Sequence, residues 1–254
     1  MKRFLVGLCL VLAACSAPHR GEGEASDRPL FDGQTLRGWV QRGGAAAYSV
    51  EDGAIVGETR PGPHNSFLCT EGPFADFELS LEFRVDDGLN SGIQVRSASR
   101  PEGAIERVFG YQIEIDPSER AWTGGLYEEG GRGWLADLKN DPVARAAFRH
   151  GEWNAMRVLC EGDRIQTWIN GVPCVDHRDA LTASGFIALQ VHAVGAKAEP
   201  LRVRWRSIVI RELQPRPRRS GAPRLSRTRT GSQPPAPRHR TTPESPTPAP
   251  ARPS

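Results

Sequence analysis

Gly110–Asp116, with the sequence GYQIEID, decides the fold class and places the candidate site. Successive side chains of a β-strand point to opposite faces. The two isoleucines of this stretch therefore share one face of a predicted strand. Its polar residues share the other face: Gln112, Glu114 and Asp116. The pattern predicts a strand with one side in the core and the other side in water or in a binding site.

The same alternation recurs in three other stretches of the chain. They are Glu78–Val85 (ELSLEFRV), Asn90–Arg96 (NSGIQVR) and Ala188–His192 (ALQVH). If all these strands lie in one sheet, its polar face gathers carboxylates, amides, a guanidinium group and an imidazole. Antiparallel sheets commonly have one wet side, so a solvated outer face is the alternative. The prevalence of Gln, Glu, His and Arg over Lys and Thr favours a site.

The sequence pattern from about residue 29 to residue 213 predicts an all-β domain. Its strand-like runs are short and are separated by turn residues, which is typical of an antiparallel sandwich or jelly roll. Asn170-Gly171 predicts a hairpin, because a type I′ turn needs positive φ at both central positions. The one expected helix is short, at Asp141–Phe148, with Pro142 in its first turn.

The first residues resemble a lipoprotein-type signal peptide, residues 1–14. A basic start and a short apolar run precede Leu12-Ala13-Ala14-Cys15, which resembles a lipobox. We expect export, lipidation of Cys15 and a membrane anchor in a bacterial cell envelope, in the periplasm or at the outer membrane. Ordinary cleavage near Ala14 is the alternative. Residues 15–28 have the composition of a flexible tether.

Residues 214–254 contain nine arginines, eleven prolines and one acidic residue. Such a composition cannot build a core, so we expect a disordered tail. The chain's net charge of +3 arises in this tail and says little about the substrate. No nucleic-acid partner is expected, since the tail has no aromatic residues to stack on bases. Three cysteines remain in the domain, and we expect them to be buried and free: Cys69, Cys160 and Cys174.

Common catalytic motifs are missing from the sequence. It has no dinucleotide-binding or phosphate-binding glycine loop, no nucleophile elbow and no H-E-x-x-H zinc motif. Carboxylates and an imidazole remain, and these suit sugar chemistry.

Eight stretches together resemble the 3-keto-disaccharide hydrolase domain family. In chain order they are Pro29–Trp39, Asn90–Arg96, Gly110–Asp116, Thr123–Tyr127, Gly151–Asn154, Gly162–Val172, Gly185–His192 and Arg206–Leu213. The resemblance implies a concanavalin A-like jelly roll of two antiparallel sheets. It also implies cleavage of glycosides that an upstream sugar 3-dehydrogenase has oxidised at C3. A base removes the C2 proton, the C1 group leaves by elimination, and water adds back.

This implied reaction assigns roles to residues of the predicted polar faces. Glu114 is the candidate base and His192 its acid or base partner, and both are candidate ligands of a divalent cation. Candidate substrate-binding residues come from the same strands and the nearby loops: Arg96, Gln112, Gln190, Tyr127, Trp134 and Asn90. Asn90 and Asp116 also suit turns, and the two aromatic residues also suit a core. The segment 121–150 is the candidate specificity loop.

Two alternatives remain open at this stage. A lectin-like carbohydrate-binding module would need the same polar face without a base. A laminarinase-type hydrolase would use paired carboxylates such as Glu114 and Asp116, but Glu119 follows Pro117 and falls in a turn. The family commonly has an acid where this chain has Gln112, so Glu114 carries the mechanism. Three tryptophans are expected to be buried: Trp153, Trp168 and Trp205.

Overall fold

The structure is a computed structural model that describes residues 26–197 and 199–214. The predicted signal peptide, Cys15, most of the tether and nearly all of the tail lie outside the described residues. Among those described, no helix has the length and apolar character needed to cross a membrane.

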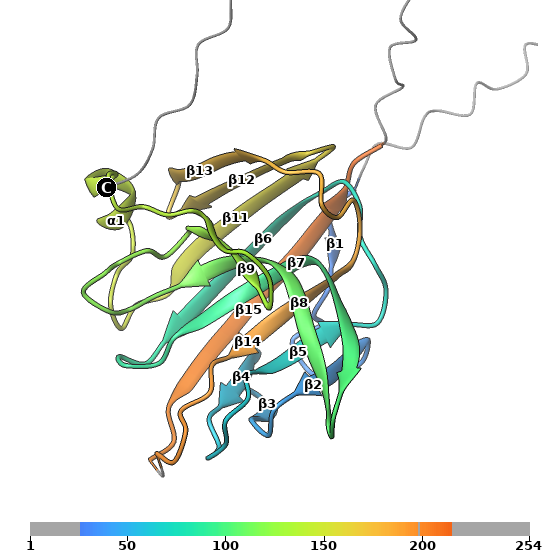
Figure 1. The fold of residues 1–254 in the computed structure, drawn as a ribbon, viewed down its shortest axis with the longest axis vertical. Helices are drawn as coiled ribbons and strands as arrows, with labels where there is room; N and C mark the ends of the chain where they lie inside the picture. Colours follow the sequence, from blue (N-terminus) through green and yellow to red (C-terminus); the bar gives the residue numbers. More distant parts are fainter. Residues whose placement is uncertain (1–25, 198, 215–254) are drawn as a thin grey trace, which may run out of the picture. The chain divides into compact units, whose positions relative to one another are not determined.

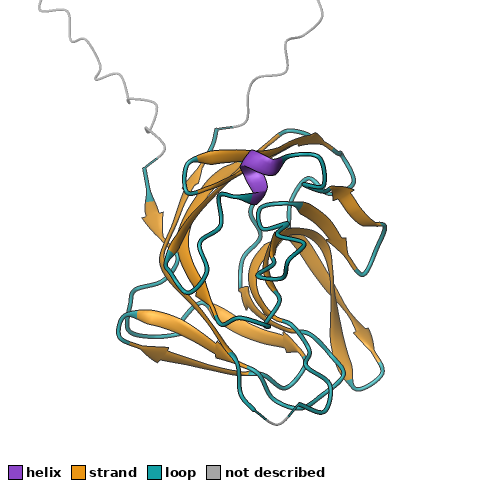
Figure 2. Cartoon of the chain, turned by 90° about the vertical axis from the view of Figure 1, so that its left-hand side faces the viewer, coloured by secondary structure: helices purple, strands orange, loops and turns teal. Residues whose placement is uncertain are grey.

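Two antiparallel sheets form the domain, in two curved layers (Figures 1 and 2). The eight-stranded sheet consists, in spatial order, of β13 (Val172–Arg178), β12 (Arg164–Ile169), β11 (Asn154–Glu161), β6 (Phe77–Val85), β15 (Arg202–Glu212), β4 (Ala54–Glu58) and β3 (Ala47–Glu51), with β1 (Arg28–Pro29) paired to β15. The seven-stranded sheet consists of β10 (Gly133–Ala136), β9 (Leu126–Glu129), β8 (Ile105–Ile115), β7 (Ser91–Glu102), β14 (Phe186–Val191), β5 (Ser66–Thr70) and β2 (Trp39–Gly43).

The apolar faces of the two sheets meet in one core, as alternation predicts. In β6, every second residue from Phe77 to Val85 is at most 3% exposed. Facing it across the sandwich are Ile113 and Ile115 of β8, both fully buried. An all-β sandwich of two antiparallel sheets is therefore confirmed.

The seven-stranded sheet curls so strongly that its two sides approach each other. β2 contacts β8, although three strands separate them in the sheet. Arg42 of β2 forms an ion pair with Glu106 of β8. The face inside the curl is hereafter the concave face. One end of it carries a small apolar cluster: Phe67, Cys69, Val108, Ala188 and Phe186.

The predicted hairpin and helix are both present. Asn170 and Gly171 have φ values of 50° and 82°, as a type I′ turn requires. The helix α1 (Pro142–Arg145) begins after Asp141, whose carboxylate accepts a hydrogen bond from the Ala144 amide at 2.9 Å. It is shorter than predicted.

The structure corrects the assumption that all four alternating stretches share one sheet. β6 lies in the eight-stranded sheet, so Glu82 and Arg84 face solvent on the far side of the sandwich. Two of the three tryptophans are also on that surface. Arg84 and Arg206 stack on Trp153, and Arg157 stacks on Trp168. Only Trp205 is fully buried.

The described residues form no disulfide. Cys69 and Cys160 are buried, and Cys174 is partly buried. Burial raises the pKa of Cys69 and Cys160 to about 12, so these thiols are unreactive at neutral pH.

Candidate functional site

Polar side chains of three adjacent strands meet on the concave face. Gln94 of β7 lies opposite Gln112 of β8, and Gln190 of β14 lies opposite Gly92 of β7. Gly92 makes this convergence possible. A Cβ atom at Gly92 would lie 2.6 to 2.9 Å from the Gln112 side chain. The missing side chain therefore gives Gln112 the space to lie across β7.

The three glutamines form a directed hydrogen-bond relay that ends at Glu114. The Nε2 atoms of Gln94 and Gln190 both donate to Gln112 Oε1, at 2.7 and 2.8 Å. Ser97 Oγ donates to Gln94 Oε1 at 2.8 Å, which fixes the orientation of that amide. With its oxygen accepting two hydrogen bonds, Gln112 turns its Nε2 toward Glu114 Oε2 at 3.0 Å. The relay holds the carboxylate in one position.

Glu114 is a buried carboxylate that accepts hydrogen bonds from its neighbours. It is 4% exposed. Its Oε1 accepts a hydrogen bond from Asn90 Nδ2 at 2.5 Å and lies 3.4 Å from Arg120 Nη2. Burial raises the pKa of Glu114 above its usual value, while the hydrogen bonds from Asn90 and Gln112 oppose the rise. The carboxylate is thus a stronger base than an exposed one.

A hollow of about 340 Å³ opens above Glu114. It is lined by Asn65, Asn90, Gln112, Glu114, Arg120, Tyr127, Glu129, Trp134 and His192. Tyr127 and Trp134 pack edge to face, with ring centroids 5.3 Å apart, and form an aromatic wall. The Arg120 guanidinium lies over the Trp134 ring at 5.1 Å. Aromatic faces and planar hydrogen-bonding groups are the usual components of a sugar-binding site.

His192 and Glu129 also line the hollow, and their hydrogen-bond partners lie outside the cluster around Glu114. His192 Nδ1 lies 2.9 Å from the Ala193 carbonyl oxygen. A carbonyl can only accept, so Nδ1 carries a proton, and Nε2 is the ring nitrogen left to exchange a proton with a bound ligand. Glu129 accepts a hydrogen bond from Asn65 Nδ2 at 3.3 Å, and burial raises the pKa of Glu129. The hydrogen bond from Asn65 and the positive charge of Arg107 oppose that rise.

Five predicted site residues line the hollow together with His192: Glu114, Gln112, Asn90, Tyr127 and Trp134. Gln190 does not. It is fully buried behind Gln112, and its Oε1 has no hydrogen-bond partner among the described residues. It therefore supports Gln112 and does not face the hollow.

Arg96 is the clear correction among the predicted substrate-binding residues. A bulge between Val95 and Ala98 breaks the alternation of β7, and Arg96 has a φ of 47°. Its fully buried side chain donates to the carbonyl oxygens of Ala75 and Gly162 and pairs with Asp76 at 2.8 Å. Arg96 is a structural tie between loops.

Three residues of the hollow were missed by the sequence analysis: Asn65, Arg120 and Glu129. Alternation in Leu126–Glu129 would have placed Glu129 beside Tyr127 on one face. Asn65 and Arg120 lie in loops, where no periodic signal exists. Asp116, predicted to suit a turn, accepts hydrogen bonds from Ser118 and holds Arg120 at 2.7 Å.

The residues of the hollow do not fit the predicted cation. Nowhere in residues 26–197 and 199–214 do three or more His, Cys, Asp or Glu side chains gather as a metal-binding group. Glu114 is surrounded by an arginine and two amide donors, which oppose a cation at the same oxygens.

Comparison with known proteins shows the family to which the domain belongs. Residues 26–211 match the family described as the 3-keto-alpha-glucoside-1,2-lyase-like domain. The chain belongs to this family. The family domain covers both sheets and the whole hollow, which confirms the resemblance found in the sequence. No curated protein matches the chain.

Solved structures share the fold of this family domain. A protein of unknown function with a galectin-like fold from Bacillus subtilis is 14% identical, with a TM-score of 0.55 over 74% of this chain and 94% of that chain. A candidate glycosyl hydrolase from Parabacteroides distasonis ATCC 8503 is 23% identical, with a TM-score of 0.50 over 74% of this chain and 100% of that chain. At these identities the likeness shows the fold alone, a galectin-like jelly roll.

Proposed function

We propose that this domain cleaves 3-keto-glycosides by elimination, with Glu114 as the general base. The observation that carries the proposal is the environment of Glu114: a buried carboxylate with a raised pKa, fixed by amide donors, at the base of a hollow with an aromatic wall. A base needs a pKa closer to the working pH than that of an exposed carboxylate.

The geometry leaves room for one proton on Glu114. An ionised carboxylate has about four lone-pair sites. Asn90 and Arg120 engage Oε1, and Gln112 engages Oε2. The remaining site, on Oε2, is the one that accepts the proton from the sugar C2.

The elimination then follows ordinary carbonyl chemistry. The C3 ketone acidifies the C2–H bond, and the electron pair of that bond forms an enolate as Glu114 takes the proton. Arg120 and Asn90 supply donors for the enolate oxygen. When the enolate collapses, a C1–C2 double bond forms and the C1–oxygen bond breaks. The departing oxygen takes a proton from an acid in the hollow, for which His192 is the predicted group. Water then adds to C1 and gives a proton to the group that protonated the leaving oxygen. Glu114, whose acidic proton exchanges with solvent in the open hollow, returns a proton to C2.

The test is turnover of 3-keto-glycosides by the wild-type domain and by Glu114→Gln. We expect the variant to lose activity by about 10²- to 10⁴-fold, the range of general-base catalysis, and to retain sugar binding. Glu82→Gln is the matched control, because Glu82 is on the outer face of the other sheet. Full activity of Glu114→Gln would refute the assignment. Parallel assays with a chelator and with added divalent cations test whether the reaction uses a divalent cation, for which Glu114 and His192 are the candidate ligands.

A carbohydrate-binding module is the second candidate, favoured by the aromatic pair of Tyr127 and Trp134. Such a module would bind unoxidised and 3-keto sugars and release no product from either. Measured sugar affinity without turnover by the wild-type domain would support this candidate. A laminarinase-type pair gains no support, since neither Asp116 nor Glu119 lines the hollow.

The cellular setting is also proposed. We propose that the chain is exported and lipidated at Cys15, as its lipobox-like sequence predicts. Labelling with an alkyne fatty acid, with Cys15→Ala as the control, tests this proposal. The substrate would come from a dehydrogenase that oxidises the C3 hydroxyl of a glycoside.

A further inference from the structure

Glu129 is the second carboxylate that lines the hollow, and the reaction proposed above gives it no role. It ends β9 and lies on the concave face with Tyr127, because residues two apart in a strand point to the same side. β9 pairs with β8 through Tyr127–Gln112 and Glu129–Gly110. Glu129 therefore faces the hollow from the strand next to that of Glu114.

Glu114 and Glu129 reach the hollow from different ends. Gly110, the partner of Glu129, is four residues from Glu114 in β8, which is about 13 Å by strand rise. Tyr127 pairs with Gln112, midway between these positions. Burial raises the pKa of Tyr127, and the charges of Glu129 and Glu114 add to the rise, so both carboxyl groups lie near its hydroxyl. A hollow of about 340 Å³ is in the size range of small-molecule sites. A substrate in it has one carboxyl group at each end.

The surroundings of the two carboxyl groups differ. Two amide donors and a guanidinium group favour the ionised form of Glu114. Glu129 Oε1 accepts a hydrogen bond from Asn65 Nδ2 at 3.3 Å, which leaves Oε2 to carry a proton. Burial raises the pKa of Glu129, and the Arg107 guanidinium that opposes the rise also pairs with Glu102 at 3.1 Å. Carboxyl groups in different surroundings can divide the roles of base and acid.

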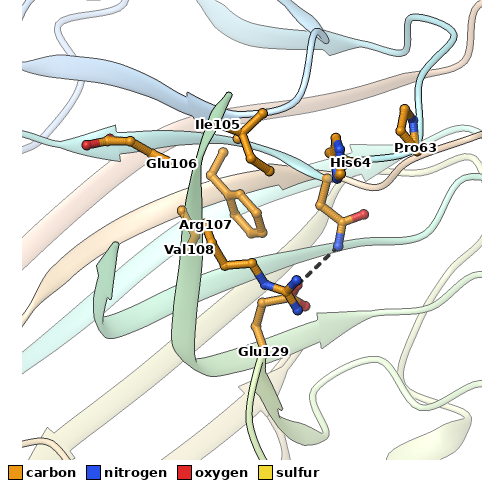
Figure 3. Close-up of a pocket in the computed structure, with 10 residues that line it drawn as sticks. Pro63, His64, Ile105, Glu106, Arg107, Val108 and Glu129 are labelled. Carbon is orange, nitrogen blue, oxygen red and sulfur yellow. Dashed lines mark hydrogen bonds between the residues drawn. The ribbon is translucent and has the colours of Figure 1, made fainter. Parts of the chain in front are cut away.

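A second pocket adjoins the hollow and gives Glu129 access to water (Figure 3). Its volume is about 150 Å³, and a cavity of about 15 Å³ is enough for one water molecule. Glu129 and Asn65 line both this pocket and the hollow. In Figure 3, the Arg107 side chain points toward Glu129 from β8. A group in this position exchanges its proton with solvent through one space and meets a substrate in the other.

His192 is less suited to deliver a proton than Glu129. It is exposed, and its Nδ1 proton is bonded to the Ala193 carbonyl oxygen at 2.9 Å. Nε2 alone remains to exchange a proton with a ligand. Burial favours the neutral form of a carboxyl group, and a neutral carboxyl group is a proton donor. The partly buried Glu129 therefore fits the role of the acid better.

We propose that Glu129 is the catalytic acid that protonates the departing oxygen. This inference rests on the function proposed above and assigns the second group of its elimination. As the C1–oxygen bond breaks, its electron pair passes to the oxygen, which takes the proton from Glu129 Oε2. Glu129 is then a carboxylate. When water adds to C1, the proton that it gives up restores the acid. Asn65 holds the carboxyl group in position.

The experiment compares two substrates whose leaving groups differ in their need for a proton. 4-Nitrophenolate is a stable anion and departs unprotonated, whereas methoxide does not. For Glu129→Gln, we expect kcat/KM to fall about 10²-fold or more for the 3-keto-methyl glycoside, the range of general-acid catalysis, and to stay within about threefold for the 3-keto-4-nitrophenyl glycoside. Glutamine keeps the acceptor for Asn65, so the fold is preserved. Glu82→Gln is the control and should change neither value. His192→Gln should affect both substrates alike.

Deuterium exchange at C2 separates failure of this inference from failure of the proposed function. In D₂O, Glu129→Gln should still exchange the C2–H of unreacted methyl glycoside, above the level seen with Glu114→Gln, because the base is intact. Equal losses for the two substrates, or no loss for either, would overturn the acid role of Glu129 while retained exchange leaves Glu114 as the base. Loss of exchange in Glu129→Gln would also overturn it. A wild-type domain that neither exchanges C2–H nor releases product would refute both proposals.

The pH profile gives a second readout. An acid must be protonated to act, so kcat/KM for the methyl glycoside falls as the pH rises through the pKa of Glu129. This basic limb should disappear in Glu129→Gln and be absent with the 4-nitrophenyl substrate. Other charged or titratable groups surround Glu129 from β8, β9 and the residues flanking β5 and β14: His64, Glu106, Arg107, Tyr127 and His192. A limb that persists in Glu129→Gln and disappears in His192→Gln would assign the acid to His192 and overturn the inference.

Discussion

The outer face of the eight-stranded sheet and the concave face of the seven-stranded sheet show the same alternation in sequence and have opposite characters. On the outer face, Glu82 pairs with Arg206 at 2.9 Å, and each side chain is more than a third exposed. On the concave face, Gln112 and Glu114 are 2% and 4% exposed. Exposed ion pairs contribute little because water screens them. The amide of Gln112 and the carboxylate of Glu114 are hydrogen-bonded on this face, and buried groups that are hydrogen-bonded hold a fixed geometry.

The difference shows that alternation alone does not separate a solvated face from a site. Two further properties separate them. The outer face of the eight-stranded sheet carries arginine and glutamate side chains, which form ion pairs and remain hydrated. The concave face carries glutamines, which form a directed relay of hydrogen bonds to Glu114, and the curl of the sheet removes them from solvent. The following predictions test this comparison, from the largest expected effect to the smallest.

Arg96→Met should be the most destabilising of the changes considered. It removes a buried guanidinium and leaves the carbonyl oxygens of Ala75 and Gly162 without this donor. Asp76 loses its ion-pair partner and keeps the hydrogen bond from the Gly162 amide. Breaking such a pair costs about 3 to 5 kcal/mol. Chemical denaturation would measure the loss in the free energy of unfolding. Sugar affinity of the folded fraction should not change, and a selective loss of affinity would restore Arg96 as a binding residue.

Gly92→Ala should damage the relay directly. The added Cβ would overlap the Gln112 side chain, which must move away from Glu114 or from Gln190. Overpacking of this kind costs about 1 to 3 kcal/mol, and we expect a comparable loss in kcat/KM of about 10-fold or more. Gly72→Ala is the control, since a Cβ there has no neighbour within 4 Å. Equal losses of stability and of kcat/KM in Gly92→Ala and Gly72→Ala would contradict the role of the relay.

Asn90→Ala should change the pH dependence of activity. The hydrogen bond from Asn90 favours the ionised form of Glu114 and lowers its pKa. Without it, the pKa of Glu114 rises further, and the base is protonated over a wider range of acidic pH. The acidic limb of the kcat/KM profile should therefore move to higher pH. A limb that stays in place would show that Glu114 does not control it.

Arg206→Ala should have the smallest effect. Arg206 stacks on Trp153 and pairs with Glu82 on the outer face. Exposed pairs of this kind contribute about 0 to 1 kcal/mol, so the melting temperature should change little and activity should not change. A large drop in the melting temperature or in activity would show that the outer face contributes to stability or to catalysis.

Much of the fold could be predicted from the sequence, because alternation and turn residues act locally. The strand at Gly110–Asp116 and the hairpin at Asn170-Gly171 are examples. The site could be predicted only where it lies on regular strands, as for Glu114 and Gln112. The bulge at Arg96 turns this side chain to the opposite face of β7, and no residue nearby in the sequence indicates the bulge. Arg120 and Asn65 reach the hollow from loops, and the curl that brings Asn65 to Glu129 depends on contacts between distant strands.

Hydrogen exchange at the sugar C2 is the measurement that tests the central claim most directly. A 3-keto-glycoside is incubated with the domain in D₂O, and the C2–H signal is followed by NMR during turnover. We predict that the wild-type domain introduces deuterium at C2 of the product and that Glu114→Gln abolishes this incorporation. Cleavage by the wild-type domain with C2–H fully retained, or undiminished incorporation by Glu114→Gln, would contradict the account.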